Sequence, residues 1–330
     1  MSVYRALAPA KVNLGLFVGA RREHDGRHRL ASVMQSISLA DELQLEPADD
    51  GDGDGGGAGG GDGAGPSGDD RGRLGTGDVL VCPGLPGAPQ DNLAARALAA
   101  FREATGWDAP AQRLTVSKRI PVAAGLGGGS ADAAATLRLA QCASGLGDEP
   151  LLRELAAGLG ADVPAQVTPG RWLATGIGEL LAPLPDPLPT LELLVLASSA
   201  QLSTADVYAA ADRLGAERDE HELEQLAEQL RVAAQLGAPL PASRELLHND
   251  LQTPALTLQP QIARVLSAVE EAGAEALLSG SGPTVLALFG HANAAGRRMR
   301  AEAALADLTP TPIAARSVGS DFARAVEIRE

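Results

Sequence analysis

The stretch Pro121-Val-Ala-Ala-Gly-Leu-Gly-Gly-Gly-Ser-Ala-Asp132 decides the fold of this chain. Four of the five residues from Gly125 to Gly129 are glycine, so almost no side chains cover the backbone there. The backbone N–H groups of such a loop can close around an anion. Apolar residues alternate before the loop and recur at helical spacing after it. The sequence therefore predicts a strand, a phosphate-binding loop and a helix in succession.

The residues on either side of the loop carry this prediction. The alternating positions of the predicted strand are Leu114, Val116, Lys118 and Ile120. Ser130 is predicted to be the N-cap of the helix, whose apolar face is formed by Ala133, Leu137 and Ala140. A flexible linker or a simple tight turn is the alternative, but a linker rarely lies between a strand and a capped helix.

The loop matches neither of two common nucleotide-binding patterns. The P-loop ends in Gly-Lys-Ser/Thr, and no lysine lies between Gly125 and Ala135. The dinucleotide pattern G-x-G-x-x-G would start at Gly125 but meets Ser130 where the third glycine belongs. We therefore expect a phosphate-binding loop of a different kind.

The composition limits the possible classes of protein. With 330 residues, 45% of them hydrophobic, the chain can form one large or two ordinary domains. The predicted strands and helices are mixed without regular alternation, which favours an α+β fold. The net charge of -15 argues against non-specific binding to nucleic acid or to an anionic membrane. No apolar segment reaches the length of a membrane span, so we expect a cytoplasmic protein.

The hydrophobic pattern predicts several further elements. Strands are expected at residues 4–18, 32–39, 42–46 and 191–197. Helices are expected at residues 91–104, at 150–159 and within 204–237. A strand–turn–strand unit is expected at residues 277–289. The prolines between Pro183 and Pro189 are expected to interrupt regular structure and to mark a domain boundary.

Residues 49–77 differ in composition from the rest of the chain. Glycine and aspartate dominate, so this segment cannot bury enough surface to offset the entropy of ordering, and we predict a disordered surface insert. A calcium-binding repeat is the alternative, but the periodic apolar position that it needs is absent. The two cysteines, Cys82 and Cys142, lack metal-ligand spacing and are expected to be reduced thiols.

Two polar residues interrupt the first predicted strand. Lys11 and Asn13 lie in the run Ala8-Pro-Ala-Lys-Val-Asn-Leu-Gly-Leu16. Side chains two apart in a strand share a face, so an ammonium and an amide would project together. The alternative is a lysine on an edge strand that points into solvent.

A carboxylate and a second glycine loop follow later in the chain. Asp162 lies in the run Leu159-Gly-Ala-Asp-Val-Pro164, where Pro164 is expected to stop a helix and so hold Asp162 in a fixed turn. A helix-capping aspartate is the simpler alternative. The run Ser279-Gly-Ser-Gly282 is typical of a tight turn between strands.

The loop at Pro121–Ala131 resembles the ATP loop of the GHMP kinases, the superfamily of galactokinase, homoserine kinase and mevalonate kinase. Within it, the chain resembles the 4-diphosphocytidyl-2-C-methyl-D-erythritol kinases. Their patterns A-K-x-N-L and G-A-D-V-P occur here at Ala10–Leu14 and Gly160–Pro164. Further matches in family order are Arg21–His28, Asp91–Arg96, Gly176–Glu179 and Leu278–Thr284.

The resemblance implies a two-domain α+β fold, with an N-terminal ribosomal-protein-like α/β domain and a C-terminal ferredoxin-like domain. We place these domains at residues 1–170 and 171–330. It also implies that ATP, with Mg²⁺, phosphorylates the 2-hydroxyl of a cytidyl diphosphate alcohol in the non-mevalonate (MEP) route to isoprenoids. The enzyme would act as a monomer or a homodimer.

The resemblance also implies roles for particular residues. Asp162 would be the base, and Lys11 would stabilise both the reacting alkoxide and the charge of Asp162. The implied ATP-binding residues are Asn92, Pro121, Val122, Ala123, Ala124, Gly125, Leu126, Gly127, Gly128, Gly129, Ser130 and Ala131. The implied substrate-binding residues are Asn13, Arg27, His28, Gly280, Ser281 and Gly282. Ser130 is the candidate protein ligand of Mg²⁺.

Two positions depart from the subfamily. Arg27 stands where an aromatic residue is usual, although a guanidinium can also stack on a base. Met34 occupies a position that is often aromatic. A homoserine- or mevalonate-type kinase therefore remains an alternative. A non-catalytic ATP-binding module is a second alternative, but such a module would not need both Lys11 and Asp162. A third alternative is an interaction protein built around the insert at residues 49–77, which lacks the apolar anchors of a defined interface.

Overall fold

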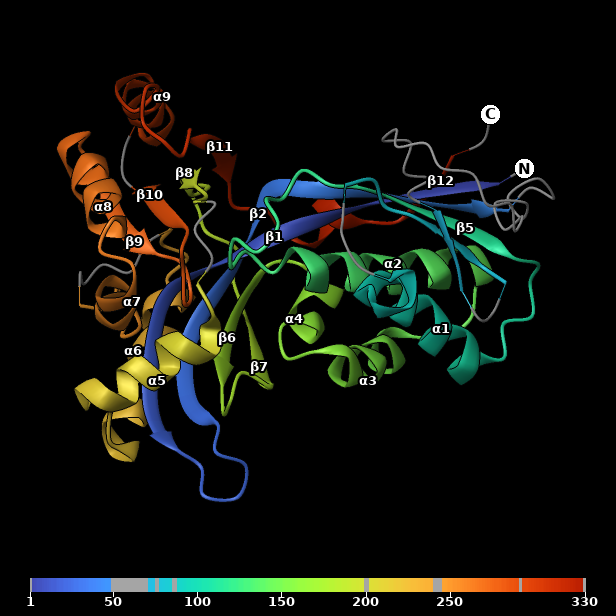
Figure 1. Cartoon of the computed structure of the whole chain (residues 1–330), viewed down its shortest axis with the longest axis horizontal. Helices are drawn as coiled ribbons and strands as arrows, with labels where there is room; N and C mark the ends of the chain where they lie inside the picture. Colours follow the sequence, from blue (N-terminus) through green and yellow to red (C-terminus); the bar gives the residue numbers. More distant parts are fainter. Residues whose placement is uncertain are drawn as a thin grey trace, which may run out of the picture.

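The computed structural model describes residues 2–48, 71–74, 77–84, 88–198, 202–239, 245–290 and 293–328. Within these ranges the chain forms two sheets with helices packed against them, so the α+β prediction is confirmed (Figure 1). None of the helices in the described ranges is both long enough and apolar enough to cross a bilayer.

The first sheet is built on two long strands. β1 (Val3–Arg21) and β2 (His28–Pro47) form an antiparallel hairpin that runs along most of the molecule (Figure 1). The sheet order is β12-β1-β2-β5-β4-β3, and β6 and β7 extend it from β2. The other strands are β3 (Arg71–Arg73), β4 (Val79–Val81), β5 (Gln112–Ser117), β6 (Arg171–Thr175), β7 (Leu180–Leu184) and β12 (Val326–Ile328).

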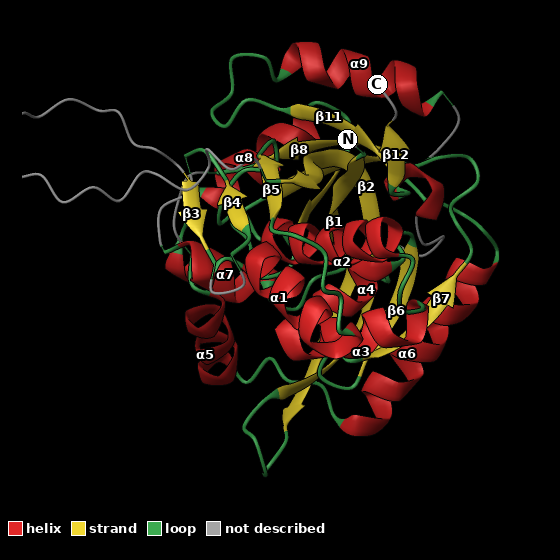
Figure 2. Ribbon diagram, turned by 90° about the vertical axis from the view of Figure 1, so that its right-hand side faces the viewer, coloured by secondary structure: helices red, strands yellow, loops and turns green. Residues whose placement is uncertain are grey.

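Four helices cover one face of this sheet (Figure 2). They are α1 (Leu93–Thr105), α2 (Gly128–Ser144), α3 (Glu149–Leu159) and α4 (Val163–Val167), with the short η2 (Pro89–Asp91) before α1. The central helix is α2, whose residues from Ala131 to Leu137 are all buried. Its many alanines let neighbouring elements approach closely. The helices predicted at 91–104 and 150–159 are confirmed by α1 and α3.

The second sheet has four antiparallel strands in the order β11-β8-β10-β9. They are β8 (Glu192–Leu196), β9 (Glu275–Leu278), β10 (Val285–Phe289) and β11 (Ile313–Arg316). Helices separate β8 from β9 and β10 from β11, so the chain follows the β-α-β-β-α-β order of a ferredoxin-like fold with additional helices. These helices are α5 (Thr204–Leu214), α6 (Glu220–Gln235), α7 (Gln252–Leu258), α8 (Ile262–Glu271) and α9 (Ala294–Ala304), and η3 (Ser320–Ala323) follows β11.

Three structural details differ from the sequence predictions. β2 is one continuous strand where two were predicted, because Ala40 and Asp41 also pair with β1. Most of the predicted 49–77 insert lies outside the described residues, but Arg71–Arg73 pair with β4 and are therefore not disordered. Pro183 lies inside β7, an edge strand of the described sheet that tolerates a missing N–H.

The division of the chain at residue 170 stays a prediction. β6 and β12 follow this position in the sequence but pair with β2 and β1 of the first sheet. Each sheet has its own buried cluster of apolar side chains. A third cluster joins β1 to the second sheet, with Ala10, Val12 and Leu14 packed together with Leu193 and Leu286. The glycine loop lies at this junction.

Candidate active site

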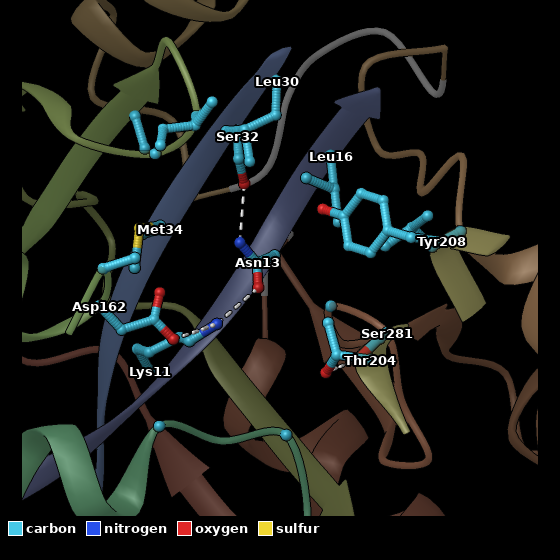
Figure 3. A pocket seen from close by; sticks show the side chains of 18 residues that line it. Lys11, Asn13, Leu16, Leu30, Ser32, Met34, Asp162, Thr204, Tyr208 and Ser281 are labelled. Atoms are coloured by element: carbon cyan, nitrogen blue, oxygen red, sulfur yellow. Dashed lines mark hydrogen bonds and ion pairs between the residues drawn. The ribbon is translucent and has the colours of Figure 1, made fainter. Parts of the chain in front are cut away.

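The centre of the site lies on β1, where its pairing with β2 shifts register between Pro9 and Lys11 and again between Asn13 and Gly15. Such irregularities bend a strand and redirect its side chains. Lys11 Nζ donates to Asn13 Oδ1 at 3.1 Å, and Asn13 Nδ2 donates to Ser32 Oγ on β2 at 2.7 Å (Figure 3). The prediction that Lys11 and Asn13 project from one face is confirmed.

Asp162 lies beside Lys11, although it comes from a distant part of the chain. Asp162 Oδ2 lies 3.5 Å from Lys11 Nζ, and the lysine side chain is only 11% exposed (Figure 3). Asp162 immediately precedes α4, but its side chain makes no capping hydrogen bond. Pro164 was predicted to stop a helix; instead it lies in the first turn of α4, where a missing N–H breaks no hydrogen bond.

A cavity of about 220 Å³ opens beside Lys11 and Asp162, and we call it the acceptor cavity. Figure 3 shows Thr204, Tyr208 and Ser281 across the cavity from Lys11 and Asp162. The lining residues are Lys11, Asn13, Leu16, Leu30, Ser32, Met34, Gly125, Gly127, Ala161, Asp162, Ala174, Ile177, Gly178, Thr204, Tyr208, Leu251, Gly280 and Ser281. The lining therefore combines one ammonium, one carboxylate and several neutral hydrogen-bonding groups with apolar surface.

His28 lies behind the acceptor cavity and does not line it. Its Nδ1 is 3.0 Å from the carbonyl oxygen of Gly19, and its Nε2 is 2.9 Å from Asp212 Oδ1. The His28 ring packs at 5.1 Å against the ring of Tyr208, which does line the cavity. Burial raises the pKa of Tyr208 to about 12, with a further contribution from the charge of Asp162. The Tyr208 phenol therefore stays neutral near pH 7.

A second cavity of about 420 Å³ lies on the other side of the glycine loop, and we call it the nucleotide cavity. It shares Gly125 and Gly127 with the acceptor cavity. Its lining residues are Asp91, Asn92, Leu93, Lys118, Ile120, Pro121, Val122, Ala123, Ala124, Gly125, Leu126, Gly127, Gly128, Gly129, Ser130 and Asp132. All of the predicted ATP-binding residues except the buried Ala131 line this cavity.

The backbone of the loop differs from the sequence prediction at its helical end. α2 begins at Gly128 with Gly127 as its N-cap, so Ser130 lies within the first turn and is not the cap. Ala123, Gly125 and Gly127 have φ values of 58°, 73° and 69°. Left-handed residues at alternate positions turn successive N–H groups toward one side, which makes an anion-binding nest.

Comparison with known families decides the identity of the fold. Residues 92–170 match the model of the GHMP kinases N terminal domain, and residues 218–305 match that of the GHMP kinases C terminal. The chain belongs to the GHMP kinases. It is an ATP-dependent kinase that acts on a small molecule.

Two relatives of this kinase carry the same name, 4-diphosphocytidyl-2-C-methyl-D-erythritol kinase. The protein of Leifsonia xyli subsp. xyli is 39% identical, covering 86% of this chain and 87% of the relative. The protein of Nocardioides sp. is 40% identical, over 87% of this chain and 88% of the relative. A crystal structure of 4-(cytidine 5'-diphospho)-2C-methyl-D-erythritol kinase matches with a TM-score of 0.70 and 32% identity, over 96% of this chain and 99% of that one. A crystal structure of a homoserine kinase from Cytophaga hutchinsonii shares the fold, with a TM-score of 0.67 and 16% identity. The match covers 99% of this chain and 97% of that one.

Arg27 of the kinase does not line the acceptor cavity. It lines a neighbouring cavity of about 640 Å³, which also contains Arg153 and which shares Ala161 and Ile177 with the acceptor cavity. Met34, the other residue that departs from the subfamily, lines the acceptor cavity itself. The two departures therefore affect different parts of the site.

A buried charge cluster beneath the glycine loop was missed by the sequence analysis. Lys118 Nζ donates to Asp132 Oδ2 at 2.7 Å and also to Asp41, whose other oxygen accepts the N–H of Ile120 at 2.8 Å. Burial raises the pKa of Asp132 to about 7; Lys118 opposes this shift, and Asp41 adds to it. The signal was present in the sequence, because Lys118 occupies an inward position in the apolar alternation that starts at Leu114.

Proposed function

We propose that this kinase transfers the γ-phosphoryl group of ATP to the 2-hydroxyl of 4-diphosphocytidyl-2-C-methyl-D-erythritol, in the non-mevalonate route to isoprenoids. One observation carries the proposal: Lys11 and Asp162 line the acceptor cavity where it meets the nucleotide cavity, at Gly125 and Gly127. A triphosphate in one cavity and an alcohol in the other would meet beside this pair. Relatives of that name at about 40% identity support the choice of alcohol.

The nucleotide cavity has the features that a triphosphate requires. None of the backbone N–H groups of Gly125–Ser130 donates a hydrogen bond elsewhere in the described chain, so these groups can hold phosphate oxygens. The positive end of the α2 dipole adds to this attraction. Asn92 accepts the N–H of Ala94 at 2.9 Å and so holds the start of α1 at the far end of the cavity. We assign that end to the adenosine.

The chemistry follows from the Lys11–Asp162 pair. Asp162 accepts the proton of the acceptor hydroxyl, whose oxygen forms a bond to the γ-phosphorus. The bond from the γ-phosphorus to the bridging oxygen breaks at the same time, and ADP leaves with that electron pair. Lys11 stabilises the negative charge on the reacting oxygen and holds Asp162 in place. Asn13 in turn accepts a hydrogen bond from Lys11 and orients its ammonium.

Mg²⁺ would neutralise charge on the phosphates when it is bound. The half-buried hydroxyl of Ser130 lines the nucleotide cavity and makes no hydrogen bond to another described residue, so it suits a hard cation that keeps several water ligands. The carboxylate of Asp132 is already bonded to Lys118 and is less available. We therefore propose Ser130 as the protein ligand.

The second glycine loop and Tyr208 would hold the substrate. Thr204 and Ser281 share a hydrogen bond of 2.9 Å at the wall of the acceptor cavity, and Asn249 donates to the carbonyl oxygen of Gly280 at 2.7 Å. These bonds fix the loop beside Asn13. The ring of Tyr208, supported by His28, offers a flat surface on which cytosine can stack. The guanidinium of Arg27 would lie at the outer end of the cytidyl diphosphate.

Further properties belong to the same proposal. We propose that the kinase acts as a monomer or homodimer in the cytoplasm and binds no nucleic acid, which its net charge of -15 supports. We also propose domains at residues 1–170 and 171–330, whose interface forms the site.

A panel of alcohols tests the proposal. Purified protein is incubated with ATP and Mg²⁺ and, separately, with the cytidyl methylerythritol, homoserine and mevalonate, and ADP release is measured. Turnover of the cytidyl substrate alone is expected. Turnover of only homoserine or mevalonate would overturn the choice of alcohol, and the Asp162→Asn variant serves as the blank for a contaminating kinase.

A further inference from the structure

Thr284 connects the second sheet to the glycine loop without lining either cavity. It is fully buried directly before β10, and its carbonyl oxygen accepts the N–H of Ser279 at 2.9 Å, which closes the second glycine loop. Its hydroxyl donates to the carbonyl oxygen of Ala124 at 2.6 Å. Thr284 therefore fixes the peptide unit between Ala124 and Gly125 in the glycine loop.

A second anchor acts on the same loop from β1. The backbone N–H of Lys11 donates to the carbonyl oxygen of Leu126 at 2.9 Å. Two carbonyl groups of the loop therefore accept hydrogen bonds from the sheets. The carbonyl of Ala124 is bound by Thr284, directly before β10 of the second sheet, and that of Leu126 by Lys11 on β1 of the first.

These two anchors determine where the loop N–H groups point. The peptide bonds after Ala124 and Leu126 are trans, because the cis bonds of the described chain all precede proline. In a trans peptide the N–H points opposite to the carbonyl group. The N–H groups of Gly125 and Gly127 consequently face away from the anchors, and both residues line the nucleotide cavity as well as the acceptor cavity.

Close packing leaves the loop little freedom on this side. A Cβ atom at Gly125 would lie 2.6 Å from the carbonyl oxygen of Gly282, so the two glycine loops touch through their backbones. The Thr284 hydroxyl satisfies the carbonyl group of the buried Ala124, directly before this contact. Without that donor a buried carbonyl group would be left unpaired, which favours rotation of the peptide unit.

We propose that Thr284 is a positioning residue for ATP: its hydroxyl aims the N–H of Gly125 at the phosphates, so that ATP affinity depends on a side chain that ATP never touches. The proposal rests on the proposed function only in taking ATP as the ligand of this loop. It also makes the second sheet, which carries part of the acceptor cavity, a structural contributor to nucleotide binding.

The test compares variants at Thr284 by binding of a non-hydrolysable ATP analogue with Mg²⁺, without acceptor. Thr284→Val keeps the shape and removes the donor, and we expect its Kd for the analogue to rise roughly 3- to 10-fold. Thr284→Ser keeps the donor and should bind within about twofold of the wild type. Thr284→Ala removes the donor without added bulk and replaces the valine variant if that variant does not fold.

A matched control separates positioning from general stability. The Thr257 hydroxyl donates to the carbonyl oxygen of Pro254 at 2.7 Å in α7, and Thr257 lines neither cavity. Thr257→Val should lower the melting temperature without changing the Kd of the analogue. Unchanged affinity in Thr284→Val and Thr284→Ala, or failure of Thr284→Ser to bind, would overturn the inference. Because no acceptor is present, a failed choice of alcohol would leave this result intact.

Discussion

The ammonium of Lys11 lies 3.5 Å from the carboxylate of Asp162, although one residue comes from β1 and the other from the turn before α4. Lys11 is nearly buried, whereas the Asp162 side chain is 43% exposed and faces the acceptor cavity. This asymmetry suits the proposed roles, since the cation is fixed and the carboxylate can reach a hydroxyl.

Replacing Asp162 with asparagine should abolish turnover and spare nucleotide binding. The variant keeps the size of the side chain but cannot accept the hydroxyl proton, so kcat is expected to fall by a factor of roughly 10² to 10⁴. Steady-state kinetics and titration of an ATP analogue provide the two measurements. Asp307→Asn, a change at an exposed position, is the control. Near-wild-type kcat in Asp162→Asn would refute the role of Asp162 as base.

Lys11→Met should reduce kcat by a comparable factor, because the methionine keeps the apolar stem and removes the charge beside the reacting oxygen. If Lys11 and Asp162 act as one unit, the double variant Lys11→Met/Asp162→Asn should be no slower than the worse single variant. Fully multiplicative losses in kcat would show that the two residues act independently. An effect confined to KM would make Lys11 a binding residue only.

Gly125→Ala should impair both stability and ATP binding. The new methyl group would meet the carbonyl oxygen of Gly282 at 2.6 Å, at a φ of 73° that already disfavours alanine. Gly145→Ala is the matched control, because its φ is 70° but no atom lies within 4 Å of the added Cβ. The control should lose about 1–2 kcal/mol from backbone strain alone and keep its KM for ATP. Equal behaviour of the two variants would contradict the loop contact.

Tyr208→Ala should weaken binding of the cytidyl substrate and leave KM for ATP unchanged. Stacking of a base on an aromatic ring contributes about 1–3 kcal/mol, so KM for the acceptor is expected to rise roughly tenfold. Tyr208→Phe keeps the ring and should remain close to the wild type. If phenylalanine fails as badly as alanine, the hydroxyl and not the ring face would be the binding group.

The stability of the protein should depend on pH through Asp132. Its pKa of about 7 lies above the usual value of 3.8, so the folded state binds this proton more tightly than the unfolded state does. The resulting stabilisation is complete at low pH and is lost as pH rises through about 7. Asp132→Asn lacks this contribution.

The measurement is the melting temperature of Asp132→Asn minus that of the wild type between pH 5 and pH 8, which should increase with pH. Taking the difference cancels the titration of groups that the two proteins share. Asp321→Asn, at an exposed position, should show no such trend. A difference for Asp132→Asn that stays constant with pH would contradict the raised pKa.

Local patterns were sufficient where the physical cause is local. A short apolar run predicted a buried strand at residues 191–197, which the structure has as β8 (Glu192–Leu196). Helical spacing predicted α1 and α3, because burial of one helix face follows directly from side-chain periodicity. The prediction of Ser130 as the N-cap of α2 was wrong. Gly127 takes the left-handed conformation and is the N-cap, so the helix begins earlier than predicted. Such a choice depends on contacts of the loop with Lys11 and Ile120, which no local pattern contains.

The sequence by itself determined the glycine loop, because a run of residues without Cβ atoms is permissive for left-handed backbone wherever it lies in the fold. It also determined that Lys11 and Asn13 share a face, which the strand period alone requires. Only the tertiary structure decided what these groups meet. Asp162 faces Lys11 because α4 packs against α2, and Thr284 reaches Ala124 because the second sheet packs against the first. Distances between residues remote in the chain follow from packing of whole elements, which no single segment encodes.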